Sequence, residues 1–398
     1  MKRVTVFTTF LAVCFFQTSS GLSDKERKLV SANNDFALRL LKTLPSSQTD
    51  NVFFSPYSLS AALGMTFAGA RGTTQREISQ VLGYTQAGLN DADVQDAFAH
   101  QNNRLQAEAA RVGLEVANSA AIQEGFEILD TYYATLNHSY NAHVFKLNFA
   151  QRGQQALEAI NEWVKRTTHG KIEKLFTEPL DTDTKLVLLN AIVFKGFWAS
   201  QFDRALTEKG PFYNGGQDRT EVDVMFQRLK TNNAFDESLK ATAVEMLYRG
   251  DDYSMVIVLP TERTGVESLK QDLTIAKLDA VTASMRNTTI ALYLPKFELE
   301  KKNDLKSHLV DLGLHKMFGD ADLSGVTGNT ELVVSDVVQR AVVKVDEEGT
   351  EAAAVTGVTE VTRVGFEPPA VNIDHPFLFF IRNRESGEIF FAGQVNKL

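Results

Sequence analysis

The chain contains almost no cysteine. Cys14 is the only one in 398 residues, and it lies within an apolar run near the N-terminus. If that run is removed on export, the mature chain has no thiol, which excludes disulfides, thiolate metal ligands and a cysteine nucleophile. Stability must then come from the burial of apolar surface, which a chain of this length can achieve.

The chain also lacks an apolar run long enough to cross a bilayer. The run from Val4 to Phe16 follows Lys2 and Arg3 and precedes small residues, an order typical of a secretory signal peptide. A buried N-terminal strand is the alternative, but the charged residues just after the run argue against it. We therefore predict a signal peptide at residues 1–21, a mature domain at residues 22–398, and a secreted, extracellular protein that binds no membrane.

Blocks of basic residues are absent as well. The chain has 41 Lys and Arg against 50 Asp and Glu, a net charge of −9, so general binding to nucleic acid is excluded. Two Asn-x-Ser/Thr triplets, at Asn137 and Asn287, are predicted glycosylation sites for a chain in the secretory pathway. Such triplets also arise by chance, so their occupancy stays open.

Motifs for catalysis are missing too. The seven histidines are scattered, and the sequence contains no H-E-x-x-H, no G-x-S-x-G and no phosphate-binding glycine motif. A Ser-His-Asp triad whose members meet only in space remains an alternative. We therefore expect a protein that is not an enzyme, with no catalytic residues, no metal and no cofactor.

Helical periodicity dominates the first third of the chain, and strand-like runs dominate the rest. Residues 24–44 repeat apolar side chains at helical spacing, and Ser55 with Pro56 marks the start of a second helix. From Lys185 onward, β-branched and aromatic runs predict strands at 185–194, 241–249, 253–260, 288–300, 331–345 and 377–395. Because no linker or repeat divides the chain, we predict a single α+β domain.

One tract, "GTEAAAVTGVTEVTR" at residues 349–363, fits neither a core, a helix nor a flexible linker. It has no large apolar side chain, and its small residues alternate so that one face could enter a dry sheet interior. These residues are Thr350, Ala352, Ala354, Thr356 and Val358. The tract can form a strand but is not required to do so; an ordinary surface loop is the alternative.

Several segments, taken together, resemble the serpins, the family of serine protease inhibitors. "EEGTEAAAVT" at residues 347–356 is similar to the hinge of inhibitory members, and "VNIDHPFLFFI" fits the family signature. "NVFFSPYSLSAALGM", "LLNAIVFKGFW", "MVIVLP", "LPKFELE" and "IFFAGQV" stand at the expected places. The resemblance covers nearly the whole mature chain, and the chain looks similar to secreted arthropod, including tick, members. It implies three β-sheets, about eight or nine helices and an exposed reactive-centre loop at about residues 347–369.

The resemblance also implies a mechanism and a partner. Counted along the hinge, the scissile bond is Arg363–Val364, and an arginine bait suits trypsin-like serine proteases. Cleavage at Thr362 or Val364 by elastase-like enzymes is the lower-ranked alternative. After cleavage the loop would insert into the central sheet as a strand and trap the protease in a covalent 1:1 complex. The expected hinge residues are Glu347, Glu348, Gly349, Thr350, Glu351, Ala352, Ala353 and Ala354.

Two further groups gain roles by resemblance. Glu347 is expected to pair with Lys296 beside Trp198, in the breach where insertion starts. Ser55, Ser58, Asn190 and Gln339 are expected to form the shutter in the middle of the sheet. Many members carry a histidine where this chain has Gln339. This difference puts only the pH dependence of opening in doubt.

The same resemblance leaves some properties open. A heparin-like cofactor site is weakly supported, since the corresponding helix offers only Arg104 and Arg111, and a solvated face is the preferred interpretation. We expect a monomer that acts on coagulation, complement or immune proteases. The alternative is a non-inhibitory serpin that serves as a carrier, storage protein or chaperone, but such members usually have charged or bulky hinge residues.

Overall fold

Two helices near the N-terminus show how closely local sequence signals set the fold. The computed structural model describes residues 21–44, 50–349 and 367–398, without the side chains of residues 108–112. Helix α1 (Asp24–Thr43) begins with a capping box in which Ser23 and Glu26 satisfy each other's backbone amides. Helix α2 (Pro56–Gly69) begins at the predicted N-cap Ser55, whose hydroxyl accepts from the Ser58 amide at 3.3 Å.

Eleven α-helices lie in the described residues, more than the eight or nine expected. The extra ones are single turns such as α4 (Tyr84–Ala87) and α11 (Ser324–Thr327), which a periodicity of 3.6 residues cannot reveal. The others are α3 (Gly72–Val81), α5 (Asp91–Val112), α6 (Asp130–Thr135), α7 (Gly153–Thr167), α8 (Val266–Asp272), α9 (Ile275–Ser284) and α10 (Lys306–Asp311). None of the described helices is long and apolar enough to cross a membrane.

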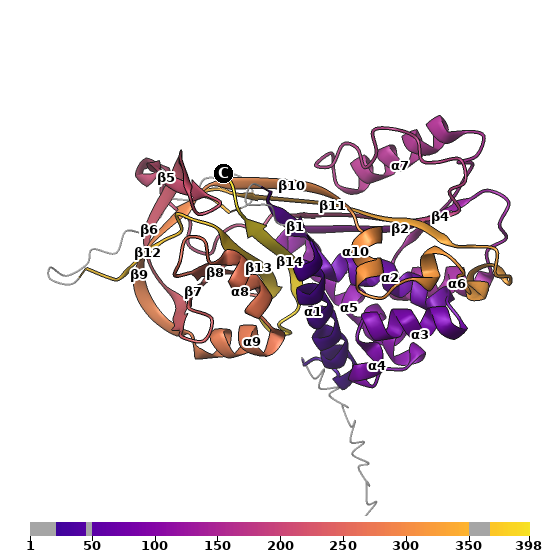
Figure 1. The fold of residues 1–398 in the computed structure, drawn as a ribbon, viewed down its shortest axis with the longest axis horizontal. Helices are drawn as coiled ribbons and strands as arrows, with labels where there is room; N and C mark the ends of the chain where they lie inside the picture. The colour runs from indigo at the N-terminus through magenta and orange to yellow at the C-terminus, as the bar shows by residue number, and fades with distance from the viewer. Residues whose placement is uncertain (1–20, 45–49, 350–366) are drawn as a thin grey trace, which may run out of the picture.

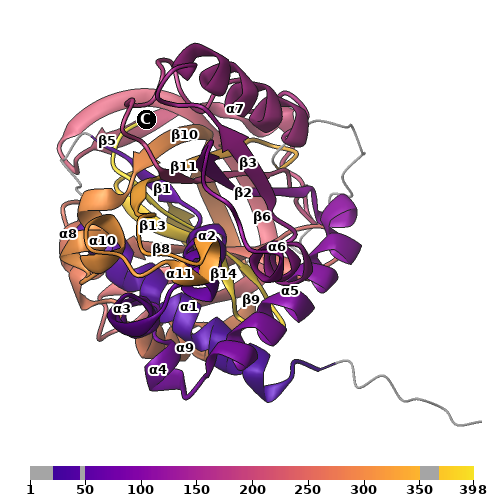
Figure 2. The same cartoon turned by 90° about the vertical axis from the view of Figure 1, so that its right-hand side faces the viewer.

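A five-stranded sheet forms the centre of the molecule, and α7 covers one face while α2, α5 and α10 lie on the other (Figures 1 and 2). Its strand order is β10 (Phe297–Asp304), β11 (Val334–Val345), β4 (Leu186–Phe194), β2 (Leu114–Gln123) and β3 (His143–Leu147). Strand β4 is buried along its whole length, as expected for a strand covered on both faces. The expectation that helices precede strands holds only in part, because β2 lies among the early helices.

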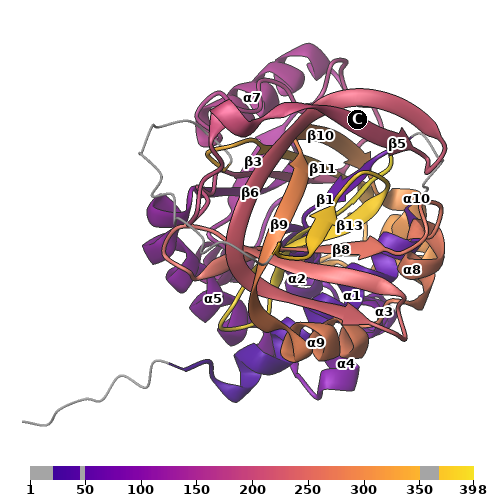
Figure 3. The ribbon, with the colours of Figure 1, turned by 90° about the vertical axis from the view of Figure 1, so that its left-hand side faces the viewer.

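The remaining strands join in one nine-stranded sheet, so the described residues form two hydrogen-bonded sheets where three were expected. The cause is β6 (Asp218–Asp236), a long, bent strand that pairs with β5 (Glu208–Asn214) at one end and β7 (Ala241–Leu247) at the other (Figure 3). The other members are β1 (Val52–Phe54), β8 (Tyr253–Pro260), β9 (Arg286–Pro295), β12 (Ala370–Asn372), β13 (Phe377–Asn383) and β14 (Ile389–Val395). The continuous strand merges two sheets into one, while the predicted α+β single domain is confirmed.

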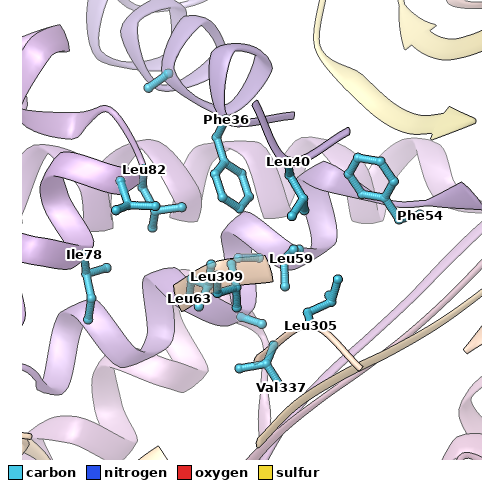
Figure 4. Close-up of a cluster of buried hydrophobic side chains, with 14 of the residues drawn as sticks. Phe36, Leu40, Phe54, Leu59, Leu63, Ile78, Leu82, Leu305, Leu309 and Val337 are labelled. Atoms are coloured by element: carbon cyan, nitrogen blue, oxygen red, sulfur yellow. The ribbon is translucent and has the colours of Figure 1, made fainter. Parts of the chain in front are cut away.

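The largest apolar cluster lies between α1, α2 and the end of the central sheet. Phe36 and Leu40 of α1 meet Leu59 and Leu63 of α2 there, and Val337 of β11 reaches the same cluster from the sheet (Figure 4). All five are fully or almost fully buried. Burying such side chains stabilises the fold by about 1.5–3 kcal/mol each, so α2 is held firmly under the central strands.

Candidate functional site

The centre of the five-stranded sheet has an unusual pairing. Strands β4 and β11 are direct neighbours and run parallel, from Val334 opposite Leu186 to Val342 opposite Val193. Each is flanked on its other side by an antiparallel partner, β2 and β10. A strand placed between β4 and β11 could therefore run antiparallel to both and hydrogen-bond to both. The segment that follows β11 would have this direction if the chain turned back after residue 345.

A polar row crosses this otherwise apolar strand pair at mid-height. Asn118 of β2, Asn190 of β4, Gln339 of β11 and Asn303 of β10 are aligned in register. The Asn190 amide donates to Asn118 Oδ1 at 2.7 Å and to the Ser58 hydroxyl of α2. The row is thus tied to the helix below the sheet, and it contains two of the predicted shutter residues, Asn190 and Gln339.

Gln339 uses both ends of its amide in this row. Its Nε2 donates to Asn190 Oδ1 at 2.8 Å and to the Ser55 carbonyl at 2.9 Å, while its Oε1 accepts from the Ser55 amide at 2.7 Å. The side chain is fully buried. One neutral amide therefore supplies the donors and the acceptor needed here, so no histidine and no charge is required to link β11, β4 and α2.

The upper end of the strand pair is held by charge. Lys296 Nζ lies 2.9 Å from Glu347 Oε2 and 3.1 Å from Oε1, and Thr207 donates to the same carboxylate at 2.9 Å. Burial alone raises the pKa of Glu347, but the hydrogen bonds from Lys296, its own backbone amide and Thr207 bring that pKa below its ordinary value. The next residue, Glu348, forms an ion pair with Arg204. Glu347 is therefore held as a buried anion, and the buried side chain of Glu348 is held in place by Arg204.

Trp198 contacts the segment after β11 at the upper end of the strand pair. Its indole donates to the Asp346 carbonyl at 2.9 Å, its backbone amide donates to the Glu348 carbonyl at 3.0 Å, and its ring stacks on Tyr248 at 4.5 Å. Only 1% of Trp198 is exposed. The tryptophan is thus a core aromatic and, at the same time, a direct support for the segment after β11.

Gly349 occupies a position that no other residue could take in this conformation. Its φ is +128°, and a Cβ there would lie 2.2 Å from the Gly196 carbonyl oxygen. It forms a β-bridge with Phe197 and closes a turn with Asp346. Because φ in this range and such close backbone contact both require glycine, any side chain at this position would collide with the backbone of Gly196 and Phe197.

The structure brings together the residues predicted for the breach and those predicted for the shutter, and it describes the hinge from Glu347 to Gly349. Thr350, Glu351, Ala352, Ala353, Ala354, Arg363 and Val364 lie outside the described residues, as do residues 1–20 of the predicted signal peptide. Arg104 pairs with Glu26 of α1, and the side chain of Arg111 is not described. Asn137 and Asn287 are both exposed.

Sequence reasoning missed several residues of this site. Asn118 and Asn303 extend the polar row, and Thr207, Arg204 and Tyr248 support the upper end. The alternation in β2 and β10 could have placed an asparagine on the inner face of each strand, but nothing in the sequence shows which strands are neighbours. No group of three His, Cys, Asp or Glu side chains in the described ranges could hold a metal ion.

A comparison with known families decides what this arrangement belongs to. The family model described as Serpin (serine protease inhibitor) matches residues 31–398. The chain belongs to the serpin family. It is therefore a member of a protease-inhibitor family and not of an enzyme family, and the parallel pair β4–β11 with its hinge is the serpin's central sheet in a state with no strand between the two.

Relatives come from arthropods and vertebrates. Iripin-2 from Ixodes ricinus is 50% identical over 400 residues, covering 100% of this chain and 99% of its own length. Intracellular coagulation inhibitor 1 from Tachypleus tridentatus is 38% identical, over 93% of this chain and 89% of its own. Among solved structures, human thyroxine-binding globulin, crystallised with its hormone, has a TM-score of 0.87 at 30% identity and covers 94% of this serpin and 99% of its own chain. Because inhibitors and a hormone carrier share this fold, the fold alone does not decide between these activities.

Proposed function

We propose that this serpin is a secreted suicide-substrate inhibitor of trypsin-like serine proteases, cleaved at Arg363–Val364. After acylation, the segment from Gly349 to Arg363 inserts between β4 and β11 and carries the covalently bound protease along. At about 3.3 Å per residue, this segment spans roughly 45 Å as a strand, which moves the protease far from its docking position. The expected species is one monomer bound to one protease.

One observation carries the proposal. The parallel neighbours β4 and β11 could take one antiparallel strand between them once they separate, and the segment that would enter begins at Gly349. The sequence of that segment has small residues at Thr350, Ala352 and Ala354, where a buried sheet face requires them. A non-inhibitory serpin would have no need for a hinge of this composition.

The first experiment is incubation of the mature protein with a panel of trypsin-family proteases, followed by denaturing electrophoresis. We expect a covalent band at the summed mass, and its loss in Arg363→Ala. Cleavage without a covalent complex at every ratio would instead favour the carrier, storage or chaperone alternative. Turnover of small esters by the serpin alone would favour an unrecognised hydrolase.

Thr350→Arg tests the insertion step separately. The arginine would enter the sheet interior as an unpaired ion, so the variant should be cleaved as a substrate without trapping. Glu351→Arg is the matched control, because it places the same side chain one residue later, on the opposite face of the inserted strand. Equal trapping by both variants would mean that the segment does not insert in this register.

Secretion and the physiological pathway belong to the same proposal. The predicted signal peptide at residues 1–21 and the exposed sequons at Asn137 and Asn287 support export and glycosylation, with coagulation, complement or immune proteases as targets. Expression in insect cells tests export directly. The mature protein should be found in the medium with its N-terminus near residue 22, and glycosidase treatment should lower its mass.

A further inference from the structure

An open groove with an apolar floor lies on the outer face of the nine-stranded sheet, next to β12. It has a volume of about 460 Å³ and is formed by β5, β6, β9 and the end of β12. Its apolar lining residues are Leu206, Pro211, Val224, Phe226, Tyr293 and Ile373. Leu206 is 44% exposed and Tyr293 is 37% exposed, two of the four large apolar residues that are exposed in the described part of the chain.

The aromatic floor of the groove is preformed. Phe226 and Tyr293 are paired across β6 and β9, with ring centroids 4.8 Å apart. Glu208, Lys209 and Asp374 provide polar groups among the other lining residues. An apolar centre with aromatic residues and polar surroundings is the usual anatomy of a protein–protein contact.

The position of the groove indicates its occupant. Asn372 and Ile373 of its lining directly follow Val371, and β12 begins at Ala370, only seven residues after Arg363. A seven-residue connection spans at most about 25 Å. A trypsin-like protease of about 220 residues is roughly 40–45 Å across. A protease bound at Arg363 therefore has its body within reach of this groove.

We propose that the groove is a secondary docking surface that takes an apolar side chain from the body of the captured protease. This inference rests on the proposed function, because it takes the protease as the partner. The inference goes beyond the proposed function because it adds recognition by the serpin's body to recognition by Arg363. The groove acts before acylation, so it should raise the rate of inhibition and leave the efficiency of trapping unchanged.

Tyr293→Ala and Leu206→Ala, singly and combined, test the groove in the full-length mature protein. The probes are active trypsin, for the second-order rate constant, and trypsin with its catalytic serine changed to alanine, for the Kd of the non-covalent complex. The combined variant should lower the rate constant and weaken the Kd by about tenfold, as for loss of an apolar contact residue. The stoichiometry of inhibition and the melting temperature should stay at the wild-type values.

Two further variants separate docking from folding. Phe235→Ala removes a 53% exposed aromatic near the other end of β6, about 30 Å along the same strand, and should change neither value. Tyr293→Phe keeps the ring and should retain wild-type docking. An unchanged rate constant and Kd in the combined variant, with covalent complex still formed, would overturn the groove and leave the proposed function intact.

The remaining outcomes are also decisive. If wild-type protein forms no covalent complex with any trypsin-family protease, both proposals fall. If the combined variant docks normally but loses binding of a fluorescent apolar dye that the wild type binds, the groove serves a small ligand, and the protease-docking proposal is wrong.

Discussion

The middle and the upper end of the contact between β4 and β11 are held by different chemistry. At mid-height, Asn118, Asn190 and Gln339 use only neutral amides and reach down to α2. At the top, the buried side chains of Glu347 and Glu348 form ion pairs with Lys296 and Arg204. The same strand pair thus has one set of contacts, the neutral hydrogen bonds, that is insensitive to pH and salt. The other set, the ion pairs, depends on both. A segment entering from the top would disturb the ionic contacts first and the neutral hydrogen bonds second.

The neutral row should contribute more to the free energy of unfolding than the ionic contacts do. Asn190→Ala removes an amide that is 1% exposed and leaves Ser58 Oγ and Asn118 Oδ1 without their donor. We expect the free energy of unfolding to fall by about 3–4 kcal/mol, since buried polar groups lose their partners. Urea denaturation measures it. Gln154→Ala, on the exposed surface of α7, should change it by less than about 0.5 kcal/mol.

The buried acid Glu388 belongs to neither set of contacts. It gives the free energy of unfolding a pH dependence that must be separated from that of the ionic contacts. Burial raises the pKa of Glu388 from 4.5 to about 7, although Asn33 and Gln101 donate hydrogen bonds to it. The folded state then binds a proton that the unfolded state has released. The free energy of unfolding should therefore fall as pH rises from about 4.5 to about 7, by on the order of 3 kcal/mol. Denaturation midpoints across this range check it, and Glu388→Gln should remove the slope.

The ionic contacts should give the free energy of unfolding a smaller pH dependence, opposite in sign to that of Glu388. The pKa of Glu347 is below its ordinary value, so its contribution is present above about pH 4.5 and is lost as pH falls through the lowered pKa. Lys296→Met leaves this buried carboxylate without its cation and should lower the free energy of unfolding by about 1–2 kcal/mol, since Lys296 is 35% exposed. Melting temperatures with and without 0.5 M NaCl measure the salt sensitivity, which the variant should lose. A full salt response in Lys296→Met would place the ionic contribution elsewhere.

The smallest effect concerns Gln339. A histidine there can still link Ser55 and Asn190, so at pH 8 Gln339→His should cost less than about 1 kcal/mol of unfolding free energy. Below pH 6.5 the variant should lose stability, because a buried imidazole resists protonation in the folded state while the unfolded chain takes up the proton. A pH series of melting temperatures tests this. Melting temperatures that follow the same pH dependence in the variant as in the wild type would show that the row is not isolated from solvent.

Much of this molecule could be predicted from local sequence. The cap at Ser55, the fully buried strand β4 and the small residues after Gly349 each follow from side-chain chemistry within a few positions. The long strand β6 was missed because charged residues line its outer face, and its continuity merges two expected sheets. Asn118 and Asn303 could not be assigned, because their role depends on the strand order β10–β11–β4–β2, which no local pattern encodes.

The groove at Tyr293 was missed for the same reason. Its floor combines β5, β6, β9 and the end of β12, segments that are up to 168 positions apart between Leu206 and Asp374. Each residue alone looks like an ordinary strand residue. Only the pairing of Phe226 with Tyr293 across two strands shows that the two rings form one surface.

The central claim is that β4 and β11 must separate for the protease to be trapped. Val193 and Val342 are directly opposite in this pair, and the only native cysteine is Cys14, so Val193→Cys with Val342→Cys can form a removable clamp. Ala121→Cys with Val187→Cys clamps β2 to β4, where nothing has to enter, and serves as the control. With trypsin, the oxidised β4–β11 clamp should give cleaved serpin and no covalent complex, and reduction should restore the complex. Equal trapping in the oxidised and reduced forms would contradict the account.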